Sequence, residues 1–388
     1  MKTGLNHVDF LTELKEHKLT KRDFVADTRR VAIAVKPDAP ANLGLAMPDV
    51  QTVSEVEADA APVPEVMDLS RHAVGQICQR LKIPFRHAER LFTNHPDLLA
   101  HQVNALFSRE PEKRMVRTLR GSVRAFLSDK FRIIDNFDVA TNILPVVESI
   151  LGINWRAAVR SCDVTESKMY IKIVRPDMVA TIPPPEGVKM GDGKHNFFVD
   201  KVQAGIKISN SEIGLGRVMI SPAIFTERCT NYASFESDKF AAVHLGRKRG
   251  EGADITELYS DETKALDDAA IFAKIKDVTK AALDGTLFDK HVKMLTEARG
   301  DEIPQGVNPV KVVEIIKDRE ALNEAEADAI IHNLMAGGDL SRYGVHAAIT
   351  RAAEDVESYD RATDLEVMGG QIIELSPDAW TTITAKAA

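Results

Sequence analysis

The segment from Arg114 to Asn136, RMVRTLRGSVRAFLSDKFRIIDN, constrains the fold more than any other part of the sequence. Basic and apolar residues alternate on both sides of Gly121, a pattern that is typical of two strands joined by a tight turn. Alternation places Arg114 and Arg120 on one face of the first strand and Arg117 on the other. The sequence therefore predicts a basic β-hairpin, the ribbon, in the middle of the chain.

Charge is distributed unevenly along the 388 residues, whose net charge is −8. Residues 1–70 hold 8 basic and 12 acidic side chains, residues 71–250 hold 28 and 18, and residues 251–388 hold 14 and 28. A basic middle between acidic ends indicates a polyanion-binding domain with solubilising flanks. The alternative is a partition of charge in sequence that forms no contiguous patch in space.

Composition places the chain among soluble globular proteins, with 44% hydrophobic and 28% charged residues. No run of 18 apolar residues is present, and the charged start has no signal-peptide core, so we expect a cytoplasmic protein. The three cysteines are far apart and the histidines show no metal-binding spacing. We therefore expect reduced thiols, no disulfide framework, and neither a metal nor another cofactor.

Apolar periodicity outlines the first third of the chain. A strand is expected over residues 31–35, a Pro- and Ala-rich loop over 36–66, and a further strand within that loop at 43–47. Ser70 is a suitable N-cap for a helix that ends before Pro84, and Pro96 suits the first turn of another. Helices are also predicted over residues 8–16, over 21–30 and over 85–92.

Strands dominate the next part of the chain. A helix is expected over residues 137–152, followed by a hairpin of strands at 153–164 and 167–177. A long loop at 182–200 leads to strands at 201–209 and 216–220, and Ser221 with Pro222 predicts a short helix towards Cys229. From Ser260 to Ala353 the pattern is helical, and the last segment reads as a closing helix with a short strand or extended tail.

These elements predict an α+β protein with a central, curved, mostly antiparallel sheet backed by helices and an acidic α-helical C-terminal region. We place the domain boundaries at residues 1–66 for N-terminal helices, strand and loop, 67–255 for the basic central domain, and 256–388 for the acidic helices.

Guanidinium groups bind phosphate oxygens bidentately, which makes the basic side chains the candidate site for nucleic acid. The predicted nucleic-acid-binding residues are Arg114, Arg117, Arg120, Arg124, Lys130, Arg132, Arg247, Lys248 and Arg249. Aromatic residues that could stack bases are Phe126, Phe131, Phe197, Phe198 and Tyr232. The competing interpretation is a structural one, in which the aromatics form core and the arginines pair internally with Asp129, Asp135 and Asp138.

Enzyme motifs are weak or absent, so the sequence favours a binding protein and predicts no catalytic residue. No P-loop and no nucleophile elbow are present, and the glycines of GLGRVM at Gly214 suit a turn before a strand. Cys229 and His244 form no recognisable thiol–imidazole motif. Glu166 and Lys168, with an upstream aspartate, leave a metal-dependent nuclease as an alternative. A protein-interaction module that counteracts host defence through the acidic surface is a further alternative.

Several runs resemble the phage- and plasmid-borne family called "domain of unknown function 932". The resemblance covers roughly residues 20–250. It rests on four runs: KRDFVADTRR, IPFRHAERLFTNHPDLLAHQVNALF, VRTLRGSVRAFLSDKFRIIDNFDVATNILPVV and VQAGIKISNSEIGLGRVMISPAIFTERCTN. Its more specific parts are RAFLSDKFRIIDN and NSEIG. It departs from the family pattern at Asn231 and Tyr232. The resemblance implies an origin in a mobile element, and it implies no established activity. The order of helix, basic hairpin, helix and strands is also similar to single-strand annealing proteins of the Redβ and Erf type.

Charge, ribbon and resemblance together predict a phage or mobile-element protein that binds nucleic acid, with single strands preferred. Annealing or binding of single-stranded DNA in recombination or replication is the expected function, and a homo-oligomer is the expected assembly. The loop around Lys189 to Phe198 would cover the bound strand. No membrane partner is expected.

Overall fold

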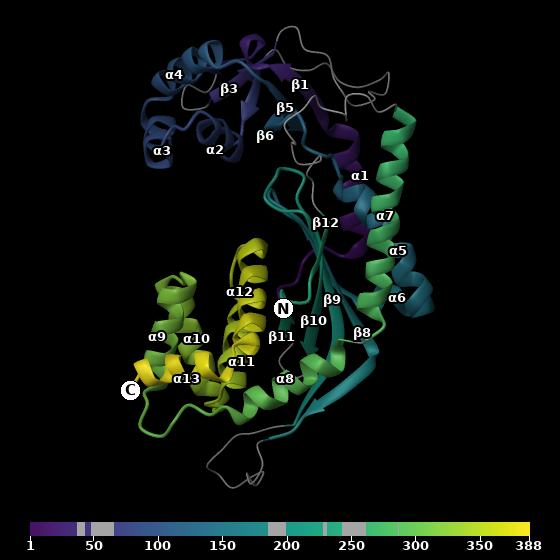
Figure 1. Ribbon diagram of the computed structural model, residues 1–388, viewed down its shortest axis with the longest axis vertical. Coiled ribbons are helices and arrows are strands. Elements are labelled where there is room, and N and C mark those ends of the chain that lie inside the picture. Colours follow the sequence, from purple (N-terminus) through teal and green to yellow (C-terminus); the bar gives the residue numbers. More distant parts are fainter. Residues whose placement is uncertain (37–42, 48–65, 185–198, 228–230, 243–260, 286) are drawn as a thin grey trace.

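The computed structural model describes residues 1–36, 43–47, 66–184, 199–227, 231–242, 261–285 and 287–388. It is an α+β protein with a six-stranded mixed sheet, a curled five-stranded antiparallel half-barrel and a helical C-terminal region (Figure 1). The predicted class and the helical C-terminal region are confirmed, but two sheets stand where one central sheet was expected.

The strands follow the predicted alternation in most places. Their bounds are β1 Arg22–Asp27, β2 Ala32–Val35, β3 Leu43–Ala46, β4 Val66–Leu69, β5 Lys113–Leu119, β6 Ser122–Ser128, β7 Val159–Val164, β8 Met169–Ile182, β9 Asp200–Asn210, β10 Val218–Thr226, β11 Asn231–Ser234 and β12 Phe240–Ala242. The hairpins predicted around Gly121 and after Val164 are both present as antiparallel pairs, β5–β6 and β7–β8.

The helices of the described residues include those predicted after Ser70 and at Pro96. Their bounds are α1 His7–Thr20, α2 Arg71–Arg80, α3 Phe85–Asn94, α4 Pro96–Arg109, α5 Asn136–Leu151, α6 Trp155–Ala158, α7 Asp261–Leu283, α8 Phe288–Gly300, α9 Pro309–Glu320, α10 Glu324–Gly337, α11 Arg342–Ala352, α12 Tyr359–Glu374 and α13 Pro377–Lys386. The Ser70 hydroxyl accepts a hydrogen bond from the amide of Ala73, which confirms the predicted N-cap of α2.

The six-stranded sheet has the order β1-β5-β6-β4-β3-β2, and only its β4–β6 pair is parallel. Helices α2, α3 and α4 pack on one face and bury residues such as Ile77, Leu99 and Phe107 against Val116. At the β2 edge, the Asn104 side chain bonds both the N–H and the C=O of Ile33, each at 2.8 Å. This sheet and its helices form the N-terminal lobe.

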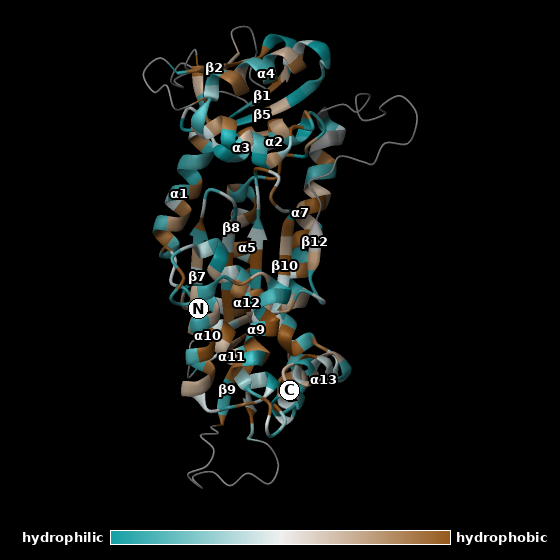
Figure 2. Cartoon of the chain, turned by 90° about the vertical axis from the view of Figure 1, so that its left-hand side faces the viewer, coloured by the Kyte–Doolittle hydropathy of each residue, from teal (hydrophilic) through white to brown (hydrophobic). Residues whose placement is uncertain are grey.

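The half-barrel has the order β11-β10-β9-β8-β7, with β12 paired to β10. Its longest pairing, β8 with β9, shifts register between Arg175 and Val179, and such bulges increase the bend of a strand. Figure 2 shows hydrophobic residues along β10. The core of this region lies between the sheet and helices α1, α5 and α7, where Phe10, Ile143 and Ile208 are buried.

The C-terminal helices bury a core of their own and dock on the half-barrel. Val313, Ile349 and Leu365 are fully or almost fully buried in that core. Between α12 and β8, the Lys172 Nζ lies 2.6 Å from a carboxylate oxygen of Glu366, and both side chains are completely buried. A charge pair in this position ties α12 to the half-barrel, because removal of either partner would leave the other charge buried and unpaired.

Four local predictions are wrong. Residues 153–158, the first half of a predicted strand, instead form a 3-10 turn and helix α6. Residues 21–30, predicted as a helix, form β1 and a 3-10 turn. Residues 22–27 pair antiparallel with β5, and this pairing with a distant segment decides their conformation. Ser221 and Pro222 lie inside β10, which continues to Thr226 where the short helix was expected to begin. The carbonyl of Pro222 accepts the Phe235 amide at 2.9 Å. The closing segment is two helices, α12 and α13, with Ser376 capping the second.

The predicted domain boundaries stay predictions. Strands on both sides of residue 66 belong to the same six-stranded sheet, so the N-terminal lobe runs across that position. Among the described residues, no helix combines the length and apolarity that crossing a bilayer requires.

Candidate nucleic-acid interface

The ribbon is built as the sequence predicts. Strands β5 and β6 pair antiparallel, and Arg120 and Gly121 form the turn with φ of +50° and +78°. Positive φ at both central residues suits the twist of a two-residue hairpin. The ribbon lies between β1 and β4 in the N-terminal lobe, so both of its strands have neighbours that can bring carboxylates to its arginines.

Arg117 lies at the centre of the ribbon and its side chain is 0% exposed. Its guanidinium donates to both carboxylate oxygens of Asp23, at 2.8 and 3.1 Å, and to Asp135 at 2.8 Å. A further bond reaches the backbone carbonyl of Glu212 at 2.9 Å. Burial alone would lower the pKa of Arg117, but Asp23 and Asp135 outweigh it and raise the pKa. The prediction that Arg117 binds nucleic acid therefore finds no support, because its guanidinium is enclosed and no phosphate can reach it in this structure.

The other ribbon arginines near the surface are also engaged by carboxylates. Arg114 pairs with Glu112, and Arg124 pairs with Glu212. At the turn, Arg120 donates to Glu13 and Glu16, both at 2.8 Å, and these hydrogen bonds raise its pKa.

The predicted residues beyond the ribbon strands divide into described and masked ones. Arg132 lies 2.7 Å from Asp267 and 2.5 Å from Asp268 on α7. Lys130 is exposed at the end of the ribbon. The second predicted cluster, Arg247, Lys248 and Arg249, lies outside the described residues. The same holds for two of the predicted stacking aromatics, Phe197 and Phe198, with most of the loop that contains them. Cys229 and His244 also lie outside the described residues.

A buried polar junction joins the ribbon to the half-barrel. Glu212 accepts the backbone N–H of Asn136 at 2.7 Å, and Asn210 donates to the side chain of Asn136 at 2.9 Å. Lys21 pairs with Asp135 from the other side. Burial alone would raise the pKa of Asp135, but the charges of Arg117 and Lys21 hold it at about 2. The RAFLSDKFRIIDN and NSEIG runs therefore meet here, in a connection between the two sheets.

Sequence reasoning missed a second basic surface, on α2 and α3. Residues 71–94 contain five Lys or Arg and a single acidic residue, Glu89. We call four of these cations the basic helical face: Arg71, Lys82, Arg86 and Arg90. All four are exposed, and no hydrogen bond or ion pair joins their side chains to the described part of the chain.

The local sequence explains why these cations point to solvent. Ala88 and Leu91 form the buried side of α3, so Arg86 and Arg90, one turn apart, lie on its opposite side. Lys82 stands in the left-handed conformation, φ +56°, at the corner between α2 and α3. The i, i+4 spacing of the arginines opposite two apolar residues was the signal available in the sequence.

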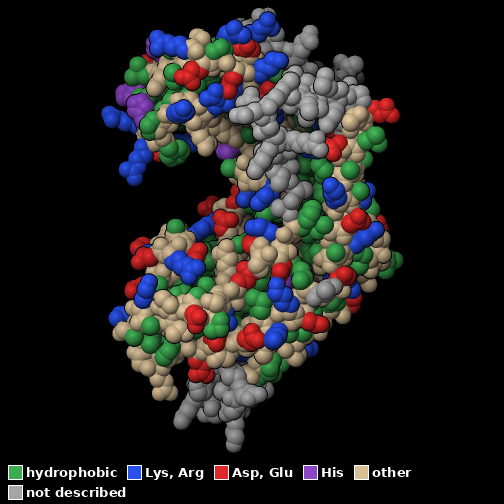
Figure 3. Space-filling model, in the orientation of Figure 1, with side chains coloured by type: hydrophobic (Ala, Val, Ile, Leu, Met, Phe, Trp, Pro, Cys, Tyr) green, Lys and Arg blue, Asp and Glu red, His purple; other side chains and the backbone are tan. Residues whose placement is uncertain are grey.

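Figure 3 places this surface beside a hollow in the molecule. Lys, Arg and His side chains gather over the helices of the N-terminal lobe, at the margin of the hollow that separates this lobe from the C-terminal helices. The basic helical face is therefore open to an extended polymer, whereas the ribbon arginines are held by carboxylates.

Aromatic residues are arranged differently from the prediction. Phe126 and Tyr232 are buried core residues, and Phe131 packs partly buried against a small apolar cluster. Phe85 at the start of α3 is instead 70% exposed. The core interpretation is therefore correct for Phe126 and Tyr232.

The nuclease alternative gains no support from the described residues. Among them, no group of three or more His, Cys, Asp or Glu side chains is arranged to hold a metal ion. Glu166 is exposed at the turn after β7, and Asp135 is already bonded by Arg117 and Lys21. Gly214, with φ +83°, lies in the turn before β10, as expected for the GLGRVM run.

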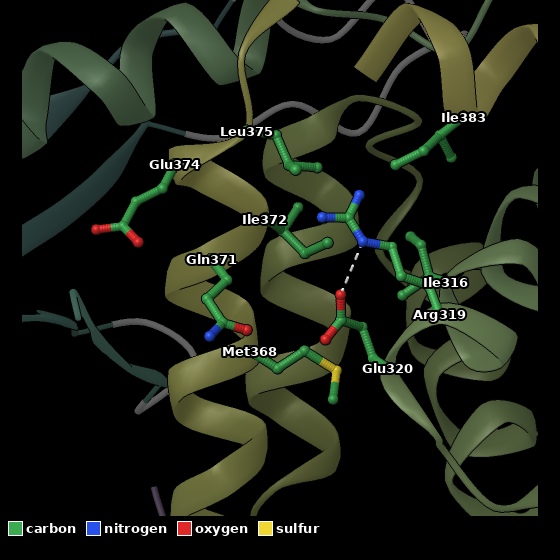
Figure 4. A pocket seen from close by; sticks show the side chains of 9 residues that line it. All are labelled: Ile316, Arg319, Glu320, Met368, Gln371, Ile372, Glu374, Leu375 and Ile383. Atoms are coloured by element: carbon green, nitrogen blue, oxygen red, sulfur yellow. Dashed lines mark ion pairs between the residues drawn. The ribbon is translucent and has the colours of Figure 1, made fainter. Parts of the chain in front are cut away.

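A cavity of about 400 Å³ lies in the C-terminal region between α9, α12 and α13 (Figure 4). Its walls include Ile316, Ile372 and Ile383, and Arg319 pairs with Glu320 inside it at 3.1 Å. The side chain of Glu374 points away from the cavity in Figure 4. The cavity is lined by C-terminal residues alone and takes no part in the basic helical face.

Comparisons with known proteins give no relative. No family model matches the sequence, and neither the curated proteins nor the solved structures contain a match. The functional argument therefore depends on the residues and the geometry described above.

Proposed function

We propose that this protein binds single-stranded nucleic acid through the basic helical face, and that it acts in recombination or replication of phage or plasmid DNA. The observation that carries the proposal is the set of four exposed cations without anionic partners among the described residues. Unpaired cations attract phosphates at no cost in broken ion pairs, and binding releases counterions from the nucleic acid.

The rest of the chain supports this placement of the interface. The acidic C-terminal region repels a polyanion, so a bound strand is favoured on the N-terminal lobe. The hollow beside the basic helical face leaves room for an extended chain. A ribbon arginine can bind a phosphate only if it first leaves its carboxylate partner. The energy of the lost ion pair is subtracted from that phosphate contact.

The experiment measures fluorescence anisotropy of a labelled thymidine oligonucleotide of about 20 nucleotides, longer than the ~4–16 nucleotides that one binding fold commonly covers. Salt titrations compare the wild type with the triple variant Lys82→Gln/Arg86→Gln/Arg90→Gln. We expect weaker binding and a salt slope smaller by about 2, at ~0.7 for each lost phosphate contact on a single strand.

A matched triple variant on the ribbon, Arg114→Gln/Arg120→Gln/Arg132→Gln, removes the same number of charges. It is expected to change affinity much less. If the ribbon variant loses affinity and the helical variant does not, the interface belongs to the ribbon. Equal affinity of the wild type for duplex DNA contradicts the single-strand preference.

A further inference from the structure

Phe85 is unusual because a large aromatic ring stands in solvent. It is 70% exposed, and it is the one Phe, Tyr or Trp of the described residues in the exposed class. Aromatic side chains carry a large apolar area, so the exposed ring of Phe85 leaves a surface that a flat ligand can cover. Phe85 is the first residue of α3 and follows Pro84, whose ring restricts the backbone there.

Cations and a second aromatic ring surround Phe85. Arg86 is its neighbour in the helix, and Lys82 lies three residues before it at the corner. Phe92 follows two helical turns later on the same flank of α3, roughly 10 Å along the axis. The guanidinium of Arg71 lies 5.7 Å from the centre of the Phe92 ring. This flank therefore alternates flat apolar rings with positive charge.

We propose that Phe85 is a stacking platform for an unpaired base of the bound strand, with Lys82, Arg86 and Arg90 on the neighbouring phosphates. The inference rests on the proposed function and names what that site recognises. A base in a duplex is already stacked on both sides, whereas a base in a single strand has a free face. Stacking on Phe85 therefore gives the site its preference for single strands and tolerates any base.

The test compares Phe85→Ala, Phe85→Leu and Phe85→Trp on two ligands of equal length and charge, a thymidine oligonucleotide and an abasic sugar–phosphate strand. Loss of one stacked base is worth ~1–3 kcal/mol, so we expect the Ala variant to bind thymidine about 5- to 150-fold more weakly. The Leu variant should bind as weakly as the Ala variant, and the Trp variant should bind at least as tightly as the wild type. On the abasic strand all four proteins should bind alike.

Outcomes separate this inference from the proposed function. Unchanged thymidine binding by Phe85→Ala overturns the stacking inference, as does an equal loss on the abasic strand, while a steep salt dependence of the wild type would still support the interface. No binding of either strand by the wild type overturns both. Circular dichroism checks that the variants are folded, and the exposure of Phe85 predicts unchanged spectra.

Discussion

The ribbon and the helices α2–α3 look alike in sequence and differ in the folded protein. Residues 113–132 contain seven basic and one acidic side chain, and residues 71–94 contain five and one. In the fold, acidic residues from distant segments pair with the ribbon, among them Glu13, Asp23 and Glu212. No such partner reaches Arg86 or Arg90 from the described residues.

The difference follows from how strands and surface helices are surrounded. A strand inside a sheet has neighbours on both sides, so residues from β1 and from the half-barrel come within bonding distance of β5. A short helix on the outside of a lobe meets other elements only along its buried side. A local excess of basic residues therefore indicates an interface only where the charged side of the helix or strand faces solvent.

Removing Arg117 from its buried ion pairs should have the largest effect on the free energy of unfolding. Arg117→Met leaves Asp23 and Asp135 buried without their guanidinium partner, which we expect to lower the free energy of unfolding by about 3–5 kcal/mol. Arg86→Met, on the basic helical face, should change it by less than ~0.5 kcal/mol. Urea unfolding measures both. Similar small losses for the two variants would contradict the distinction between structural and free arginines.

Acid should lower the free energy of unfolding through Asp135, a buried partner of the ribbon. The cations of the basic helical face have no carboxylate partner among the described residues whose protonation would add to this loss. The pKa of Asp135 is about 2 in the folded protein, below the ordinary value of 3.8. Its ionised form therefore stabilises the fold above pH 4, and that contribution of about 2 kcal/mol is lost as the pH falls from about 4 to 2.

Urea unfolding at a series of pH values down to 2 follows this loss. The variant Asp135→Asn should start less stable and show a shallower decline over the same interval. An identical pH profile for variant and wild type would mean that Asp135 does not carry the effect.

Gly214 lies in the turn before β10, where its neighbours include Leu127 of the ribbon. Its φ is +83°, and an added Cβ would lie 2.8 Å from Cδ2 of Leu127 on β6. We expect Gly214→Ala to cost about 1–2 kcal/mol through the left-handed backbone, as measured by thermal or urea unfolding. Gly75→Ala, where nothing lies within 4 Å of the added atom, serves as the control and should cost no stability.

The smallest expected effect concerns the acidic residue of the helical face. Glu89→Gln removes the one carboxylate between Phe85 and Phe92, which should tighten oligonucleotide binding by a factor of about 2–5, as expected for an exposed charge worth less than ~1 kcal/mol. The matched change Glu16→Gln removes one partner of Arg120 on the ribbon. Anisotropy titrations should find little gain there, and a larger gain than for Glu89→Gln would favour the ribbon as the interface.

Local patterns in the sequence predicted much of the fold. The turn at Gly121, the cap at Ser70 and the strands after Val164 each depend on residues close in sequence, and all are present. The 21–30 segment was assigned to a helix because its alternation of polar and apolar residues is too short to indicate a strand by itself. Pairing with β5, which is distant in sequence, decides its conformation.

The candidate site was harder to predict because it depends on distant partners. Asp23 lies 94 residues from Arg117 in sequence, and Glu212 lies 88 residues from Arg124. No local pattern states that these side chains meet. The exposure of Phe85 was equally hidden, because an aromatic residue at the start of a helix is compatible with either core or surface.

Asn104 has a consequence for how copies of this protein can meet. Its amide occupies the hydrogen-bonding groups of Ile33 on β2, the strand at the margin of the six-stranded sheet. A sheet margin with open amides is a template for another chain, and through it for aggregation. With Ile33 already satisfied, sheet-to-sheet addition at this strand is disfavoured, so ordered assemblies would have to form through other surfaces.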